Sequence, residues 1–268
     1  ITINLNNKKG LIKTVESVVK QTYTSLEYIV IDGGSTDGSK EYVYSQASKL
    51  VYWESQPDSG IYAAMNKGLQ QAKGEYCLFL NSGDWLLTDD ILEKVFSEIH
   101  VEDILICGCQ ISLAGTIIST ISPPNEISLL SILKNSLPHQ AIFIKKKLFD
   151  STGLYSESYK IHGDFEFWIR TIILLNSSCK AISIVVSDYN LEGVSALDSN
   201  QVDGQKEVNT VLRNALPERV LIDYYKWIEN QKEFEVFDWI ASKPSLLRNF
   251  QSLYKLIKSA AGFRKPII

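Results

Sequence analysis

Three aspartates lie in short loops that follow apolar runs. Asp32 ends the run of VIDGGSTDGS, Asp58 lies in QPDSG, and Asp84 lies in NSGDW. A carboxylate can accept a hydrogen bond from a ligand N–H, bind a hard cation such as Mg²⁺, or take up a proton. The three loops are therefore candidate parts of one ligand site, provided that the fold brings them together.

By itself, the glycine-rich loop after Asp32 is more typical of a turn than of a ligand site. Glycine supplies a positive φ angle, and Ser35 or Asp37 can cap the following helix. The loop does not fit the calcium-loop template, because Gly34 and Thr36, which offer no carboxylate or amide oxygen in their side chains, occupy its ligand positions. The loop also lacks the G-K-[ST] of a phosphate loop and the G-x-G-x-x-G of a dinucleotide site. Evidence for a ligand must therefore come from the other loops.

Strand and helix patterns alternate up to about residue 110. Strand-like runs occupy residues 1–5, 26–31, 49–55 and 75–80, and helix-like segments occupy 10–21, 36–48 and 60–74. This alternation predicts an α/β fold with a parallel sheet and right-handed crossovers, in which ligands bind at the carboxyl ends of the strands. The loops that begin at Asp32, Gln56 and Asn81 would open onto that edge.

The composition is that of an ordinary globular protein. The 268 residues are 45% hydrophobic, enough for one large domain or for one domain with an appendage. The net charge of −4 gives no overall basic field, so nucleic acid is not an expected partner. The four cysteines form no C-x-x-C pair, and no apolar run reaches about 18 residues. We therefore expect a cytoplasmic protein without structural zinc, disulfides, a signal peptide or a spanning helix.

Five segments, in this order, resemble the family 2 glycosyltransferases of the GT-A fold, particularly the bacterial branch that builds surface polysaccharides. They are VIDGGSTDGS, SQPDSGIYAAMNKG, LFLNSGDWL, LPHQAIFIKKKLF and IHGDFEFWIR. The resemblance implies a Rossmann-like GT-A domain over residues 1–190, with a mainly parallel sheet flanked by helices. Its nucleotide-sugar-binding half would span about 1–110 and its acceptor half about 111–190. A helical extension would follow at 191–268.

The resemblance assigns the amino-terminal loops to a nucleotide-sugar donor, with a UDP-sugar favoured. Asp32 matches the aspartate that hydrogen-bonds the base, and the backbone from Ile3 to Asn6 would line the same pocket. Asn66 and Lys67 begin a region that would face the diphosphate, although Lys67 fits a plain helix surface equally well. The donor-binding candidates are Ile3, Asn4, Asn6, Asp32, Asp58, Asn66 and Asn81.

The third loop departs from the pattern of many relatives, in which an Asp-x-Asp motif holds Mg²⁺ or Mn²⁺ against the donor diphosphate. This chain has Asn81-Ser82-Gly83-Asp84, so Asp84 is the only acid in the motif. A hard cation can be held by one or two carboxylates together with phosphates and water. Asp84, assisted by Asn81, is therefore the predicted metal site. Alternatively, Asp84 is only a turn residue before Trp85.

Asp164 in HGDFEFW aligns with the catalytic aspartate of the family. Phe165, Trp168, Ile169 and Ile172 recur after it at helical spacing, so Asp164 is expected at a helix start, where an N-cap role is compatible with catalysis. The resemblance implies that Asp164 deprotonates an acceptor hydroxyl in an inverting transfer. Candidates for contacts to the acceptor or the diphosphate are His139, Gln140, His162 and Glu166, and Glu166 is expected to face away from Asp164.

The predicted function is the metal-dependent transfer of one hexose-type sugar from a nucleoside-diphosphate sugar to a hydroxyl of a glycan or lipid-linked sugar. The Q-x-x-R-W element of processive synthases is absent, which favours single addition. Two alternatives stay open: a nucleotide-sugar-binding module without activity, and a nucleotidyltransferase. The latter should carry a glycine-rich basic loop near its amino terminus, and NLNNKKG matches such a loop poorly.

The carboxyl-terminal stretch carries no motif of the family. Its helix-like segments are 204–231, 235–243 and 244–265. In the last segment, apolar residues such as Leu246 and Phe250 share a face opposite basic residues such as Lys255. Two interpretations are open: this apolar face packs on the catalytic domain, or the helix rests on the anionic inner face of the cell membrane.

Overall fold

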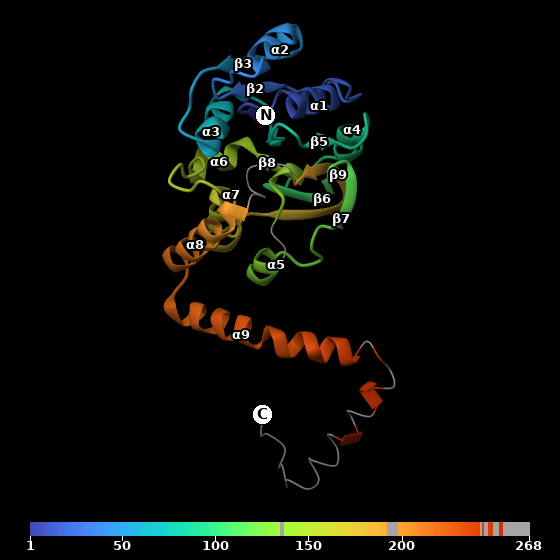
Figure 1. The fold of residues 1–268 in the computed structure, drawn as a ribbon, viewed down its shortest axis with the longest axis vertical. Helices are drawn as coiled ribbons and strands as arrows, with labels where there is room; N and C mark the ends of the chain where they lie inside the picture. The colour runs from blue at the N-terminus through green and yellow to red at the C-terminus, as the bar shows by residue number, and fades with distance from the viewer. Residues whose placement is uncertain (135–136, 192–197, 242, 244–245, 249–251, 254–268) are drawn as a thin grey trace. The chain divides into compact units, whose positions relative to one another are not determined.

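The computed structural model describes residues 1–134, 137–191, 198–241, 243, 246–248 and 252–253. The chain divides into two compact units, Ile1–Ala215 and Leu216–Ile268 (Figure 1). The first unit contains all the predicted site residues and extends beyond residue 190, the predicted domain boundary. It does so because α8 (Asp198–Ala215) packs against α7 (Gly163–Trp168) and the adjoining η3 segment (Ile169–Leu174).

The first sheet has three parallel strands in the order β1-β2-β3. The strands are β1 (Thr2–Asn4), β2 (Ile29–Asp32) and β3 (Tyr52–Ser55), and the helices that follow them are α1 (Lys8–Val19), α2 (Ser39–Ser45) and α3 (Ile61–Gln71). In register, Asn4 pairs with Asp32 and Asp32 pairs with Ser55, so the three strands end side by side. This arrangement confirms the predicted parallel α/β alternation.

The predicted strand at 75–80 is divided between two partners. Its first part, β4 (Tyr76–Cys77), pairs antiparallel with β8 (Ile142–Lys145). Beyond β4 the chain turns to β1, where the N–H groups of Leu80 and Ser82 donate hydrogen bonds to the carbonyls of Ile1 (2.9 Å) and Ile3 (3.0 Å). These bonds carry the Asn81–Asp84 loop along β1, toward the end of the first sheet.

The second sheet is mixed, with the order β4-β8-β6-β9-β5 and with β7 paired to β6. Its other strands are β5 (Trp85–Leu86), β6 (Ile104–Leu113), β7 (Thr116–Ile121) and β9 (Cys179–Asn190). Among the described strands of this sheet only β6 and β9 pair in parallel. A hairpin joins β6 and β7, because Ala114 and Gly115 adopt the positive φ angles (49° and 79°) that favour a two-residue turn.

The remaining helical segments are shorter or lie toward the carboxyl end. They are η1 (Ala47–Lys49), α4 (Ile91–Val95), α5 (Leu129–Lys134), η2 (His139–Ala141), α6 (Lys146–Thr152) and, in the second unit, α9 (Glu218–Ala241). The helix predicted at 204–231 is interrupted at Pro217, because proline lacks an N–H and its ring clashes with the preceding turn. The helix predicted at 235–243 is instead the end of α9.

The third helix predicted in the carboxyl-terminal stretch, at 244–265, falls mostly on positions outside the described residues. Its membrane-binding and core-packing interpretations are therefore both untested. Within the described ranges, no helix combines the length and apolarity that crossing a membrane requires.

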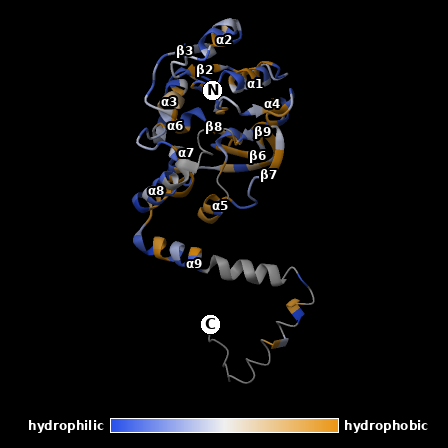
Figure 2. Ribbon diagram, viewed as in Figure 1, coloured by the Kyte–Doolittle hydropathy of each residue, from blue (hydrophilic) through white to orange (hydrophobic). Residues whose placement is uncertain are grey.

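Apolar side chains of both sheets form the main core. All four residues of β2 and the first six of β6 are buried, and Figure 2 shows the hydrophobic character of these strands. Cys107 and Cys109 belong to this core, and burial raises the pKa of both thiols to about 12. Such thiols are inert at neutral pH, so these two cysteines act as small apolar residues.

An aromatic cluster holds α7 in place. Phe167 of α7 stacks on Phe149 and contacts Tyr155, which in turn contacts Phe79. Phe165, Trp168, Ile169 and Ile172 are also buried, as their helical spacing predicts. Burying one large apolar side chain contributes about 1.5–3 kcal/mol. The cluster therefore fixes the helix on which Asp164 lies.

Candidate active site

Asp32 lies at the end of β2 and is 0% exposed. Its Oδ1 accepts hydrogen bonds from Asn4 Nδ2 (2.7 Å) and Ser35 Oγ (2.5 Å), and its Oδ2 accepts from the Ser35 N–H (3.0 Å) and Ser55 Oγ (2.6 Å). Burial alone would raise the pKa of Asp32, but these hydrogen bonds outweigh it and lower the pKa. In this conformation Asp32 joins the three strand ends and presents no exposed oxygen to a donor base.

The other candidates from the first strand also bond within the protein. Ile3 and Asn4 are buried, whereas Asn6 is exposed. The Oδ1 of Asn6 accepts from the Thr36 N–H (2.8 Å), and the Asn6 N–H donates to Ser35 Oγ (2.7 Å). The segment after β1 is thus tied to the glycine-rich loop, and its predicted role in lining the donor pocket stays a prediction.

Gly33 and Asp58 are in close contact across two loops. A Cβ atom at Gly33 would lie only 2.8 Å from Asp58 Oδ2 and 3.4 Å from Leu5 Cδ1. The other oxygen, Asp58 Oδ1, accepts a hydrogen bond from the Gly60 N–H (3.0 Å). Asp58 is partly exposed and Leu5 is 60% exposed. The missing side chain at Gly33 therefore leaves room for a carboxylate and an apolar side chain that ligands can reach.

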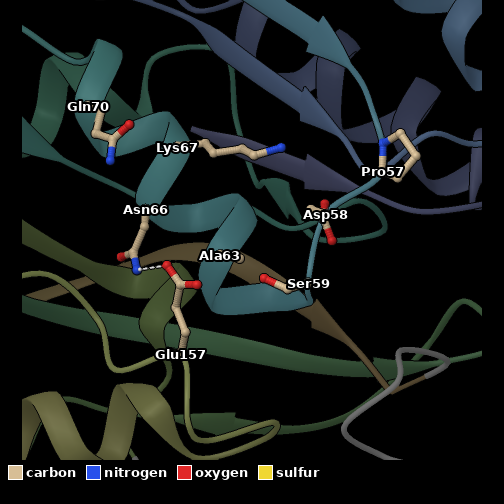
Figure 3. Close-up of a pocket in the computed structure, with 8 residues that line it drawn as sticks. All are labelled: Pro57, Asp58, Ser59, Ala63, Asn66, Lys67, Gln70 and Glu157. Carbon is tan, nitrogen blue, oxygen red and sulfur yellow. Dashed lines mark hydrogen bonds between the residues drawn. The ribbon is translucent and has the colours of Figure 1, made fainter.

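Asp58 also lines a pocket of about 380 Å³ beside α3, together with Pro57, Ser59, Ala63, Asn66, Lys67, Gln70 and Glu157 (Figure 3). The amide of Asn66 donates to Glu157 Oε1 (3.0 Å) and the Tyr155 carbonyl (2.9 Å), and it accepts from the Tyr155 N–H (3.0 Å). Lys67 forms an ion pair with Glu54 (3.1 Å). Both predicted diphosphate contacts are therefore engaged by protein partners.

Asp164 lies in the first turn of α7 and is held on both carboxylate oxygens. Its Oδ1 accepts from the Phe165 N–H (2.8 Å) and lies 3.2 Å from Tyr62 Oη. Its Oδ2 lies 3.2 Å from His139 Nδ1, and His139 Nε2 lies 3.1 Å from Asn81 Nδ2. A chain of contacts thus connects the Asn81–Asp84 loop, η2 and α7, which lie far apart in the sequence.

The pKa values of the central pair shift in opposite directions. Burial alone would raise the pKa of Asp164, but the hydrogen bond and charge of His139 outweigh it and lower that pKa. Burial alone would lower the pKa of His139, but Asp164 outweighs it and raises that pKa. The Asp164 side chain is also 17% exposed, so the ionised carboxylate remains reachable from solvent.

Asp84 is buried, with 5% exposure. Its Oδ1 accepts from the Asn190 N–H (3.1 Å) and its Oδ2 from Gln140 Nε2 (3.4 Å). Burial is the main cause that raises the pKa of Asp84 to about 7. Gln140 itself is buried and donates to Asp84. A direct contact of Gln140 with a substrate stays a prediction.

Two oxygens of the Asn81–Asp84 loop suit a hard cation. Burial of the Asp84 carboxylate outweighs the effect of the nearby His139, and Asn81 Oδ1 is buried with no hydrogen-bond partner among the described residues. Those residues contain no group of three His, Cys, Asp or Glu side chains that could hold a metal. Mg²⁺ commonly binds to one or two protein oxygens plus substrate phosphates, so this small donor set fits a cation that arrives with a diphosphate.

His162 and Glu166, the remaining predicted contacts, have structural partners. His162 packs closely on Gly204 of α8, where an added Cβ would lie 2.8 Å from its Nε2. Glu166 forms an ion pair with Arg170 (2.8 Å), which also donates to the Thr152 carbonyl. Glu166 is therefore engaged by Arg170, and through Arg170 it ties α7 to the end of α6.

Two residues around Asp164 are absent from the sequence-based site. Glu207 of α8 accepts the backbone N–H groups of residues 160–162 at 2.8–3.0 Å, which anchors the segment before α7. Tyr62 of α3 reaches Asp164 across about a hundred residues of sequence. Neither residue belongs to a local spacing pattern. For Tyr62, the one sequence signal of a role in the site was that it lies in the same motif as Asp58 and Asn66.

The fold and this set of loops are those of GT-A glycosyltransferases. The sequence model of the family named glycosyl transferase family 2 matches residues 1–153, more than half of the chain. An uncharacterized glycosyltransferase of Mycobacterium tuberculosis is 33% identical over 205 residues, which are 73% of this chain and 76% of that protein. The chain therefore belongs to glycosyl transferase family 2 and is a glycosyltransferase.

Solved structures share the fold. Staphylococcus aureus TarS 1–349 in complex with UDP-GlcNAc superposes with a TM-score of 0.64 and 21% identity, over 82% of this chain and 67% of that one. The mannosyltransferase PcManGT of Pyrobaculum calidifontis, in complex with GDP-Man and Mn²⁺, gives a TM-score of 0.53 and 17% identity, over 70% of this chain and 55% of that one. At these identities the likeness shows the fold alone.

Proposed function

We propose that the chain transfers one sugar, with inversion, from a nucleoside-diphosphate sugar to a hydroxyl group of a glycan or a lipid-linked sugar. One observation carries this proposal: the ionised, partly exposed carboxylate of Asp164 is linked through His139 to the loop of Asn81 and Asp84. A base is thereby joined to the loop that would handle the diphosphate. The nucleotide sugars bound by TarS and PcManGT support the donor class.

Asp164 is the general base of the proposed reaction. Its carboxylate takes the proton of the acceptor hydroxyl while that oxygen forms a bond to the anomeric carbon. The bond from the anomeric carbon to the diphosphate breaks on the opposite face, and the nucleoside diphosphate leaves with the bonding electrons. One positioned base is enough for this displacement, and typical general-base contributions are about 10²–10⁴-fold in rate.

Asp58 is the proposed contact for the donor base. Its Oδ2 lies over the bare backbone of Gly33, next to the exposed side chain of Leu5. Uracil has an N–H donor on its edge and a flat face that can pack on an apolar side chain, which suits one carboxylate oxygen beside one apolar side chain. Asp32 stabilises this surface, because its hydrogen bonds join the three strand ends. A UDP-sugar remains the favoured donor, because its base is uracil.

Asp84 and Asn81 are the proposed ligands of Mn²⁺ or Mg²⁺. When bound, the cation would neutralise the charge that develops on the leaving diphosphate. Asp84 must be ionised to bind it, and its pKa of about 7 makes that ionisation dependent on pH near neutrality. The Mn²⁺ present with PcManGT supports metal use.

A donor-binding module without activity is the second candidate. It is favoured if Asp164 is remote from the Asn81–Asp84 loop, and the contacts through His139 argue against that separation. A nucleotidyltransferase has no support from the family to which the chain belongs. Reversible membrane contact through residues 244–265 is a further proposal, supported only by the pattern of apolar and basic residues in the sequence.

The test of the proposed function is Asp164→Asn, assayed with a panel of nucleotide sugars and Mn²⁺. We expect kcat to fall by about 10²-fold or more, while the affinity for the nucleotide, measured by calorimetry, is retained. Asp150→Asn is the control, because Asp150 is an exposed carboxylate paired with Lys146 on α6. Normal turnover in the Asp164 variant would contradict the proposal.

A further inference from the structure

The two oxygens of Asp164 are held from two different elements. Tyr62 of α3 contacts Oδ1, and His139 of η2 contacts Oδ2. Building on the proposed role of Asp164 as the base, we propose that Tyr62 and His139 are positioning residues that set the orientation of its carboxylate toward the acceptor. Neither has to touch a substrate for this role.

The Tyr62 hydroxyl is placed by tertiary contacts. Its Oη donates to the Ile161 carbonyl at 2.6 Å and lies 3.2 Å from Asp164 Oδ1. Burial, together with the nearby charge of Asp164, raises the pKa of Tyr62 well above its usual value, so the hydroxyl keeps its proton. It therefore serves as a neutral donor shared between a carbonyl one turn before Asp164 and the carboxylate itself.

Gly163 allows this approach. A Cβ at Gly163 would lie 2.8 Å from three ring carbons of Tyr62. The aromatic ring therefore packs directly on the bare backbone at the start of α7, where any side chain would displace it. On another side, the ring centroid of Tyr62 lies 5.7 Å from that of Tyr155. Gly163 does not have a positive φ angle, so its backbone conformation does not require glycine. Its close packing against Tyr62 does.

His139 holds the second oxygen. Asn81 Nδ2 is a donor, so its 3.1 Å contact makes His139 Nε2 an acceptor. Nδ1 therefore carries a proton in the neutral ring as well as in the charged ring, and it donates to Asp164 Oδ2 at 3.2 Å. Asn81 thus sets the tautomer of His139, and His139 sets the carboxylate. One lone pair of Oδ2 stays available for the acceptor hydroxyl.

The Tyr62 contact is tested by a pair of matched variants. Tyr62→Phe removes the hydroxyl and keeps the ring, whereas Tyr155→Phe removes a buried hydroxyl of the same cluster that has no hydrogen-bond partner among the described residues. We expect Tyr62→Phe to lower kcat roughly fivefold to tenfold, the range of one hydrogen bond, with the donor KM unchanged. Tyr155→Phe should keep the wild-type kcat. Equal kcat values in the two variants would overturn the role of Tyr62.

The His139 contact is tested by His139→Asn and His139→Gln. The asparagine amide can occupy the position of Nδ1 and still donate to Asp164, whereas the glutamine amide reaches the position of Nε2 and Asn81. We expect His139→Asn to keep most of the kcat and His139→Gln to lose roughly tenfold, the value of a hydrogen bond to a charged group. The opposite order would overturn the positioning role and point to the contact with Asn81.

Asp164→Asn separates this inference from the proposed function. If that variant is active, the base assignment fails and the positioning role fails with it. If it is inactive while Tyr62→Phe and His139→Gln both turn over at the wild-type rate, the positioning inference alone is overturned. Thermal unfolding of each variant identifies losses of kcat that come from misfolding.

Discussion

Asp32 and Asp164 are two carboxylates with lowered pKa values. Asp32 is fully buried at the end of β2, whereas Asp164 is partly exposed at the start of α7. Asp32 has four hydrogen bonds from protein groups and 0% exposure, whereas Asp164 has fewer partners and 17% side-chain exposure. The partners of Asp32 are short polar groups of the strand ends and of the loop after β2, whereas the side-chain partners of Asp164 come from two elements distant in sequence, α3 and η2. A carboxylate becomes available for chemistry when some of its accepting positions stay free.

The largest expected effect is on stability at Asp32. Asp32→Ala leaves the partner groups of Asn4, Ser35 and Ser55 without their acceptor in a buried position, so we expect the free energy of unfolding to fall by about 3–5 kcal/mol. Urea unfolding followed by circular dichroism measures this. Asp164→Asn should change the free energy of unfolding by less than about 1 kcal/mol. Equal losses in the two variants would remove the distinction between them.

The next effect concerns Asp84, whose pKa is raised, in contrast to the other two. Its folded pKa of about 7 lies above its ordinary value of 3.8, so the folded protein holds a proton that the unfolded chain releases between these values. Stability in EDTA should therefore fall as the pH rises from 4 to 7, by a total on the order of 3 kcal/mol.

Asp84→Asn should flatten this pH dependence and make the protein more stable than the wild type at pH 8 in EDTA. Mn²⁺ should stabilise the wild type more at pH 8 than at pH 6, because the cation binds the ionised carboxylate. Thermal unfolding with and without Mn²⁺ measures both effects. A pH-independent response to Mn²⁺ would show that Asp84 is not the ligand.

Asp58 gives a smaller effect, on donor binding. Asp58→Ala should weaken the binding of UDP by roughly tenfold, the value of one hydrogen bond to a charged group, without changing the free energy of unfolding by more than about 1 kcal/mol. Calorimetric titration with UDP measures it. Gly33→Ala should reproduce the loss, because its Cβ would meet Asp58 Oδ2. Unchanged affinity for UDP in both variants would show that a group other than Asp58 binds the uracil base.

Lys67 should give the smallest effect. Its ion pair with Glu54 is partly exposed, and such pairs contribute about 0–1 kcal/mol. We expect Lys67→Ala to leave the donor KM within twofold of the wild type, which steady-state kinetics can check. A large increase in KM would restore Lys67 as a diphosphate contact and would make its pairing with Glu54 a feature of the free protein.

The sequence by itself determined the local elements and the family. Short apolar runs and period-3.6 patterns were enough to predict the strands and helices up to α3, because each depends on residues only a few positions apart. The spacing after Asp164 likewise predicted the burial of Phe165, Trp168, Ile169 and Ile172, but not that of Phe167 and Thr171. The motifs resemble those of family 2 glycosyltransferases, and the family match over residues 1–153 agrees with that resemblance.

Only the tertiary structure decided how far protein partners occupy the oxygens of each carboxylate. The sequence favoured Asp32 as the base contact, but hydrogen bonds from Asn4 and Ser55, on neighbouring strands, occupy its oxygens. Asp58 became the alternative because Gly33 lacks a Cβ, and Tyr62 reached Asp164 because Gly163 lacks one as well. The exposure of a carboxylate, the number of its hydrogen bonds and the close approach of backbone segments depend on contacts between parts of the chain that are distant in sequence. Local residue patterns therefore do not predict them.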